Sequence, residues 1–105
     1  MASDNFALTE AVYYILLSLF EPLHGYGIMQ NVDSMSSGRV KLAAGTLYGA
    51  ISTMLDKGWI EALPGESSSR RKEYVISALG REVVIKELIR LKELIGNGDR
   101  MIRGK

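Results

Sequence analysis

Apolar residues recur every three or four positions along residues 9–20, the first patterned segment of the chain. Its main apolar face begins at Leu8, directly before the segment, and continues with Val12, Ile15, Leu16 and Leu19. This spacing predicts a helix, because positions three, four and seven apart share one face. Glu21 and Pro22 are expected to end the helix, since proline disfavours helical geometry in the residue before it.

The same segment has a second apolar stripe on its opposite side. That stripe consists of Tyr13, Leu17 and Phe20. A helix that is apolar on two sides is buried on two sides, either in a large core or against another chain. A chain of 105 residues forms only a small core, so contact with a partner subunit is the simpler explanation.

Two further helices are predicted from the same kind of spacing. The second begins after Gly25 and ends at residues 36–38 (SSG). The third covers residues 45–57, and its core face consists of Leu47, Ile51, Met54 and Leu55. Gly58 is expected to cap the third helix in a left-handed conformation, with Trp59 packing back on the last turns.

The opposite face of residues 45–57 holds only small side chains. Its members are Gly45, Thr46, Gly49, Ser52 and Thr53. Such a face has little bulk to fold against, and it lets the backbone approach another molecule closely. This face, rather than the core face, is therefore the candidate functional surface.

A β-hairpin is predicted after the third helix. Ile60–Leu63 and Glu73–Ile76 are short runs rich in apolar, β-branched and aromatic residues, which is typical of strands. The loop between them, residues 65–71, contains no apolar residue. We therefore expect this loop to project from the body and to move.

A long helix is predicted from Ala78 to about Ile95, with Ser77 as its N-cap. Its apolar seam consists of Val84, Leu88, Leu91 and Ile95, at spacings of four, three and four. With its apolar flanks, this seam is wider than packing on one side requires, which again indicates a partner chain. Residues 96–98 (GNG) are expected to end the helix and to leave a frayed, basic tail.

Charge is nearly balanced over the whole chain but unevenly distributed along it. Residues 1–38 contain four acidic residues and no lysine or arginine, whereas residues 39–105 contain all 13 basic residues and eight acidic ones. This asymmetry indicates a surface suited to an anion. In the long helix, alternating charges are more typical of a solvated face. The run at residues 70–72 (RRK) is the exception, because it follows a small polar loop.

The composition excludes several kinds of chemistry. The chain has no cysteine and a single histidine, His24, which excludes disulfides, thiolate metal sites and histidine clusters. The early carboxylates show no pairing at helical spacing, and no nucleophile lies near His24 in sequence, so we expect neither an enzyme nor a cofactor. The apolar stretch at residues 11–20 is too short to cross a bilayer, and no basic residue precedes it as in a secretory signal. A cytoplasmic protein without membrane contact is therefore expected.

The predicted order of three helices, a hairpin with a basic loop and a long helix is that of a winged helix-turn-helix with a dimerisation helix. Residues 24–28 (HGYGI), 42–51 (LAAGTLYGAI), 70–74 (RRKEY) and 79–81 (LGR) resemble the PadR family of bacterial transcriptional regulators. The resemblance covers about residues 8–95, and the single terminal helix is similar to that of the short subfamily.

The resemblance implies a mainly helical α+β fold with two parts. Residues 1–77 would form the winged helix-turn-helix DNA-binding domain, and residues 78–105 the C-terminal dimerisation helix with a short basic tail. It also implies a homodimeric, sequence-specific regulator, expected to be a repressor, that recognises a palindromic operator in double-stranded DNA. A winged helix that binds only protein partners is the alternative, because the fold does not dictate its use.

DNA contacts are expected from the N-terminal end of the helix near residues 45–57 and from the basic wing near residues 65–72. The candidate residues are Lys41, Gly45, Thr46, Tyr48, Gly49, Ser69, Arg70, Arg71 and Lys72. The resemblance implies that the Tyr48 hydroxyl contacts a phosphate and that Thr46 contacts a base or a phosphate. A ring half-buried beside the second helix is the alternative interpretation of Tyr48.

An alternative function is that of a ligand-responsive sensor of drugs or phenolic compounds. The apolar dimer interface would then bind a small aromatic effector. The residues concerned are Tyr13, Leu17, Phe20, Val84, Leu88, Leu91 and Ile95. Plain packing between subunits is the simpler interpretation of the same residues. Leu91 stands where drug-binding members of the short subfamily carry tryptophan, so capture by stacking is not expected.

Overall fold

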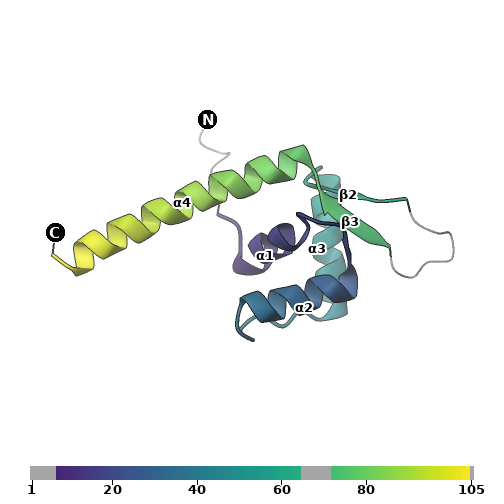
Figure 1. Cartoon of the computed structure of the whole chain (residues 1–105), viewed down its shortest axis with the longest axis horizontal. Coiled ribbons are helices and arrows are strands. Elements are labelled where there is room, and N and C mark those ends of the chain that lie inside the picture. The colour runs from purple at the N-terminus through teal and green to yellow at the C-terminus, as the bar shows by residue number, and fades with distance from the viewer. Residues whose placement is uncertain (1–6, 65–71, 105) are drawn as a thin grey trace.

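The computed structural model describes residues 7–64 and 72–104, and within them it contains four α-helices and three short strands (Figure 1). In chain order these are α1 (Glu10–Ser18), β1 (Leu23–His24), α2 (Gly25–Met35), α3 (Ala44–Asp56), β2 (Ile60–Ala62), β3 (Glu73–Ile76) and α4 (Ala78–Ile102). The fold is mainly helical α+β, as predicted. α4 extends as a rod well beyond the body that the other elements form (Figure 1), and the molecule measures 59 × 34 × 21 Å.

One apolar core joins α1, α2 and α3 to the strands and to the beginning of α4. Its buried apolar members are Ile15, Leu16, Leu19, Ile28, Val32, Leu47, Ile51, Met54, Trp59, Ile60, Tyr74, Ile76 and Val84. The helical spacing therefore predicted the core together with the helices, because residues that share a face are buried together. Leu55 was expected in the core but is 36% exposed, since the buried face of α3 is narrower than the apolar pattern.

Polar side chains cap three of the four described helices at their N-terminal ends. The caps are Thr9, His24 and Ser77, whose side chains accept hydrogen bonds of 3.0–3.2 Å from the backbone N–H three residues further on. Each bond satisfies a donor that has no partner inside its helix. The N-cap of α3 is Ala43, which makes no such bond.

α3 ends as the sequence predicted. Gly58 has a positive φ of 77°. The Trp59 N–H donates to the carbonyl oxygen of Met54 at 3.0 Å, and the Gly58 N–H donates to that of Leu55 at 3.0 Å. This pair of bonds is the Schellman motif, which ends a helix and directs the chain into β2.

The sheet has three antiparallel strands in the order β1-β3-β2, rather than the two strands of the predicted hairpin. Leu23 in β1 pairs with Tyr74 in β3, and Ile60 in β2 pairs with Ile76. A strand of two residues is too short to show alternation of apolar and polar positions, so the pattern could not reveal β1. The loop at residues 65–71 lies outside the described residues, and its projection and movement stay predictions.

α4 continues to Ile102, so the predicted end near Ile95 and the predicted frayed tail are wrong. Residues 96–98 (GNG) lie inside the helix. Glycine costs a helix interior only about 1 kcal/mol per residue relative to alanine. Side-chain pairing such as that of Arg103 with Asp99, at 3.1 Å, supports the last turns against this cost.

Candidate nucleic-acid interface

α2 and α3 form the two helices of a helix-turn-helix, and α3 turns its small side chains outward. Gly45, Thr46 and Gly49 are all exposed. A Cβ atom built at Gly45 or at Gly49 would meet no other atom within 4 Å. The N-terminal half of α3 is therefore an open surface on which another molecule can approach the backbone.

The first turn of α3 is also suited to an anion. Its N-cap, Ala43, makes no side-chain hydrogen bond, and the turn contains no acidic residue. The first N–H groups of a helix have no partner within it and carry a partial positive charge. A phosphate oxygen at this end would accept from those groups.

Tyr48 lies where α2, α3 and the wing strand β3 meet. It is 47% exposed, yet its hydroxyl packs so closely on Gly25, the first residue of α2, that a Cβ atom there would collide with it. Burial and the neighbouring Tyr48 raise the pKa of Tyr74 in β3. The Tyr48 ring is thus packed beside α2, as the alternative interpretation had it, while about half of the residue remains open to solvent.

The cations ahead of α3 are paired with acidic residues of the first half of the chain. Lys41 Nζ lies 2.9 Å from Asp33 Oδ2, and the Arg39 guanidinium pairs with Glu10. All four side chains are more than two-fifths exposed, and exposed pairs of this kind contribute about 1 kcal/mol or less. Lys41 can therefore exchange its partner for a phosphate at little cost.

The wing is only partly described. Lys72 is exposed directly before β3, so its ammonium group is available at the base of the wing. Ser69, Arg70 and Arg71 lie outside the described residues, and their predicted DNA contacts stay predictions.

The structure distributes the seven residues predicted for a subunit interface or an effector chamber over the core, half-buried positions and the exposed surface. Val84 is only 4% exposed and belongs to the core of its own chain, because the beginning of α4 packs on α1 and β3. Tyr13, Leu17 and Leu91 are half-buried. The exposed members are Phe20, Leu88 and Ile95, at 37%, 41% and 68%. The part of the seam available to a partner therefore begins at Leu88.

The length of α4 extends this seam beyond the predicted end of the helix. Gly98 and Ile102 continue its alternation of three and four residues, and Ile102 is 86% exposed. The exposed large apolar residues of α4 are Leu79, Ile85, Leu88, Ile89, Leu94, Ile95, Met101 and Ile102. Three of them, Leu88, Ile95 and Ile102, lie in the seam, and an apolar stripe of this kind on a projecting helix is typical of an interface.

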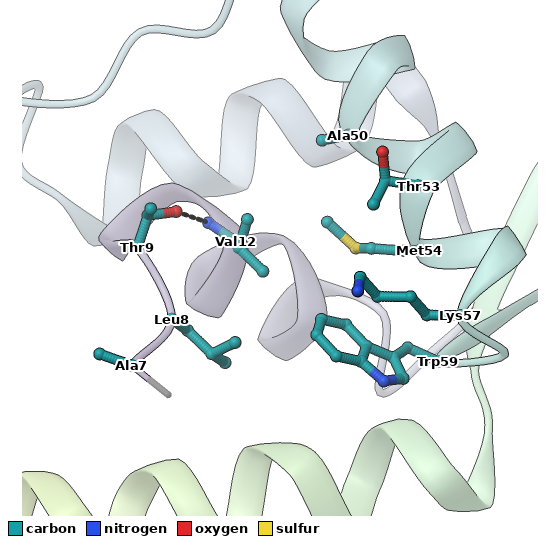
Figure 2. A pocket seen from close by; sticks show the side chains of 9 residues that line it. All are labelled: Ala7, Leu8, Thr9, Val12, Ala50, Thr53, Met54, Lys57 and Trp59. Atoms are coloured by element: carbon teal, nitrogen blue, oxygen red, sulfur yellow. Dashed lines mark hydrogen bonds between the residues drawn. The ribbon is translucent and has the colours of Figure 1, made fainter. Parts of the chain in front are cut away.

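Two hollows in the described surface could receive a ligand. One, of about 400 Å³, is lined by Leu17, Ser18, Phe20, Glu21, Pro22, Leu23, Asn31 and Met35, and so includes two of the predicted effector residues. The other, of about 290 Å³, lies between the start of α1 and the C-terminal half of α3 (Figure 2). Its walls are mostly apolar, and the Lys57 ammonium group lies 5.4 Å from the centre of the Trp59 ring. The sequence pattern assigned Trp59 only a capping contact and did not indicate this hollow.

Sequence reasoning also missed Glu87. This carboxylate is only 5% exposed, although it lies on a helix whose charged residues were expected to face solvent. Its spacing, three residues after Val84, was the available signal, because positions three apart share a helix face.

Residues 7–64 and 72–104 contain neither a membrane-spanning helix nor a cluster of metal ligands. No helix there is long and apolar enough to span a membrane. No three potential metal ligands gather in this part of the chain either.

Comparison with known proteins agrees with this architecture. The family model described as the transcriptional regulator PadR-like family matches residues 14–86. No curated protein matches the chain. Among solved structures, RosR of H. salinarum is 25% identical, with a TM-score of 0.71 over 98% of this chain and 89% of that one. A PadR family regulator from Eggerthella lenta is 21% identical, with a TM-score of 0.71 over 90% and 82% of the two chains. Another, from Clostridium difficile, is 19% identical, with a TM-score of 0.69 over 87% and 97%.

Proposed function

This chain belongs to the PadR-like family of transcriptional regulators, which bind DNA and are not enzymes, and from that premise we propose that it is a homodimeric repressor. In this proposal the dimer acts in the cytoplasm and recognises a palindromic operator. The open, small-sided N-terminal half of α3 is the observation that carries the proposal. Residues 1–77 would bind the DNA, and residues 78–105 would join the two subunits.

The shape of α3 supports its role as the recognition helix. Gly45 and Gly49 have open space around them, so the helix backbone can come close to base edges in the major groove. Thr46, exposed between them, supplies a hydroxyl that can donate to a base or to a phosphate. The polarity of the helix start favours a nearby phosphate as well.

Side chains around α3 would hold the DNA backbone. The Tyr48 hydroxyl lies beside the N-terminal end of α2, where a phosphate could contact both. Lys41, ahead of α3, and Lys72, ahead of β3, are both exposed, and cations at such positions bind phosphates without specifying sequence. Ser69, Arg70 and Arg71 would extend these contacts along the wing.

The apolar face of α4 supports the dimer. The C-terminal part of this helix projects from the body (Figure 1), and helices without tertiary packing are marginally stable in water. Burial of the seam against a second copy would supply that packing. A dimer with two-fold symmetry presents its two α3 helices to half-sites about 34 Å apart, one turn of DNA.

A ligand-responsive sensor is the second candidate function. The hollow of about 290 Å³ beside Trp59 favours it (Figure 2), because apolar walls with a single ammonium group suit a small apolar acid. This location differs from the predicted chamber between subunits. Calorimetric titration with sodium benzoate, with benzamide as the uncharged control, would separate a ligand site from plain packing.

The substitution Gly49→Leu tests the main proposal. A leucine side chain would fill the open space on α3 without touching the core, so operator affinity should fall by about tenfold or more, the effect of losing one good base contact. The operator is first obtained by selecting bound sites from random DNA duplexes, and affinity is then measured by fluorescence anisotropy.

Gly96→Leu is the matched control. Gly96 is also an exposed helical glycine with open space around it, but it lies on α4. Its substitution should leave operator affinity unchanged, and both variants should melt no lower than the parent because leucine favours helices more than glycine does. Parental affinity in the Gly49→Leu variant, or a selection that recovers no palindrome, would overturn the proposal.

A further inference from the structure

Glu87 is a buried carboxylate on α4, only 5% exposed. Its Oε2 atom accepts a hydrogen bond from the Leu8 N–H at 3.3 Å. The Arg90 guanidinium donates to both carboxylate oxygens, from Nε at 2.9 Å and from Nη2 at 2.6 Å. A charge pair that served only the helix could remain in solvent, so the burial of Glu87 and its bond to Leu8 indicate a tertiary role.

The bond to Leu8 joins α4 to the beginning of α1, 79 residues apart in sequence. Leu8 directly precedes Thr9, whose Oγ1 accepts from the Val12 N–H at 3.1 Å and so begins α1 (Figure 2). On the side that faces α3, Leu8 borders the hollow of about 290 Å³ (Figure 2). Because of this hollow, the chain around Leu8 is only weakly packed against α3. The hydrogen bond to the Glu87 carboxylate holds the same part of the chain against α4.

Glu87 is also the last buried anchor of α4 on the body. Gly80 packs so closely on the Trp59 carbonyl oxygen that a Cβ atom there would collide with it. Val84, one turn further on, is 4% exposed, and Glu87 is 5% exposed. Beyond Arg90, which is partly exposed, no residue of α4 is buried. The 15 residues that follow Glu87, residues 88–102, form an arm about 22 Å long, along which a small tilt at its base is amplified.

We propose that Glu87 is a positioning residue that sets the angle between α4 and the winged-helix body, and through it the half-site spacing that the dimer accepts. The inference rests on the proposed function, since it requires two copies joined through α4. In such a dimer the two-fold axis relates the helices α4, so their angle to each body determines the distance and rotation between the two α3 helices. An anchored α4 accepts one spacing, whereas a loosened α4 accepts several.

The selectivity of the 105-residue chain for operator spacing tests this inference. The probes are the selected palindrome, the same palindrome with one base pair inserted or deleted at its centre, and a duplex with a single half-site. Anisotropy at one fixed salt concentration gives the affinity ratio between the parental and altered spacings, because affinities at different salt concentrations are not comparable.

Three variants separate positioning from charge and from folding. Glu87→Ala removes both bonds, and Glu87→Gln keeps an acceptor for Leu8 but loses the two-pronged pairing with Arg90. Asp99→Asn is the matched control, because it makes the same charge change and breaks the exposed pair of Asp99 with Arg103 on the projecting part of α4. Should Glu87→Ala fail to fold, Glu87→Gln still provides the test.

The expected result is a loss of selectivity with little change in half-site affinity. Glu87→Ala should reduce the ratio between spacings by about fivefold or more, the low end of coupling between distant sites. Glu87→Gln should reduce it less, and Asp99→Asn should keep the parental ratio. A parental ratio in both Glu87 variants, or an equal loss in Asp99→Asn, would overturn the inference. If the parent itself prefers no palindrome, the proposed function fails instead, and the two failures are thereby distinguished.

Discussion

α3 and α4 both expose a continuous face from a single chain, but the two faces have opposite chemistry. α3 presents glycine and hydroxyl side chains around an open backbone, whereas α4 presents large apolar side chains on an arm that projects from the body. The small polar face needs no partner for stability, because solvent satisfies it. The apolar face would gain stability from a partner, since its exposure to water is unfavourable. Exposure alone therefore does not define a function; the chemistry of the exposed face supports the proposed division between DNA contact by α3 and subunit contact by α4.

The largest expected difference between the two faces is in their response to salt, which should weaken DNA binding but not the contact between apolar faces. Three or four cations per subunit, six to eight per dimer, predict a slope of about −5 to −7 in log affinity against log salt concentration, which is about a thousandfold to ten-thousandfold loss between 50 and 200 mM. Contact between apolar faces is not screened in this way. Anisotropy with the operator and sedimentation of the free protein, measured over the same salt range, would check both. A dimer that dissociates in step with the loss of DNA binding would show that the two faces do not differ as described.

The substitution Ile95→Lys should break the α4 side of the comparison. Ile95 is 68% exposed in the single chain, so the variant should fold, but a dimer would bury two new charges at its seam. We expect the dimer to dissociate and operator affinity to fall by about a hundredfold, as for a central interface residue. Sedimentation gives the oligomeric state and anisotropy the affinity.

Ile89→Lys is the control for this change. Ile89 is 62% exposed on the same helix but lies outside the seam, so this variant should remain dimeric. A dimeric Ile95→Lys variant would remove α4 from the proposed interface.

The smallest expected effect concerns the base of α4 at low pH. Hydrogen bonds from Arg90, followed by the bond from Leu8, hold the pKa of Glu87 below its usual range, against the opposing effect of burial. A carboxyl group with a lowered pKa stabilises the folded state above its unfolded pKa, and this contribution is lost as pH falls through the folded value. The parent should therefore lose more of its free energy of unfolding than Glu87→Gln when the pH falls below the ordinary glutamate range. Urea unfolding at neutral and acid pH measures the difference; equal losses would contradict it.

Local features of the candidate site were predictable, and long-range ones were not. The small face of α3 followed from the spacing of Gly45, Thr46 and Gly49, because helix periodicity assigns residues to faces without knowledge of the rest of the chain. The contact of Tyr48 with Gly25 was only one of two alternatives, since it depends on how α3 crosses α2. The bond between Leu8 and Glu87 had no local signal for a partner.

The sequence by itself determined the three-residue and four-residue periods of the helices, most of the core, the cap at Gly58 and the order of elements that the family shares. The tertiary structure decided that β1 completes the sheet, that α4 runs through residues 96–98, that Val84 turns inward and that Glu87 is buried. The physical reason is the range of the interactions. Periodicity and capping act within a few residues, whereas these other features depend on contacts between segments that only the folded chain brings together.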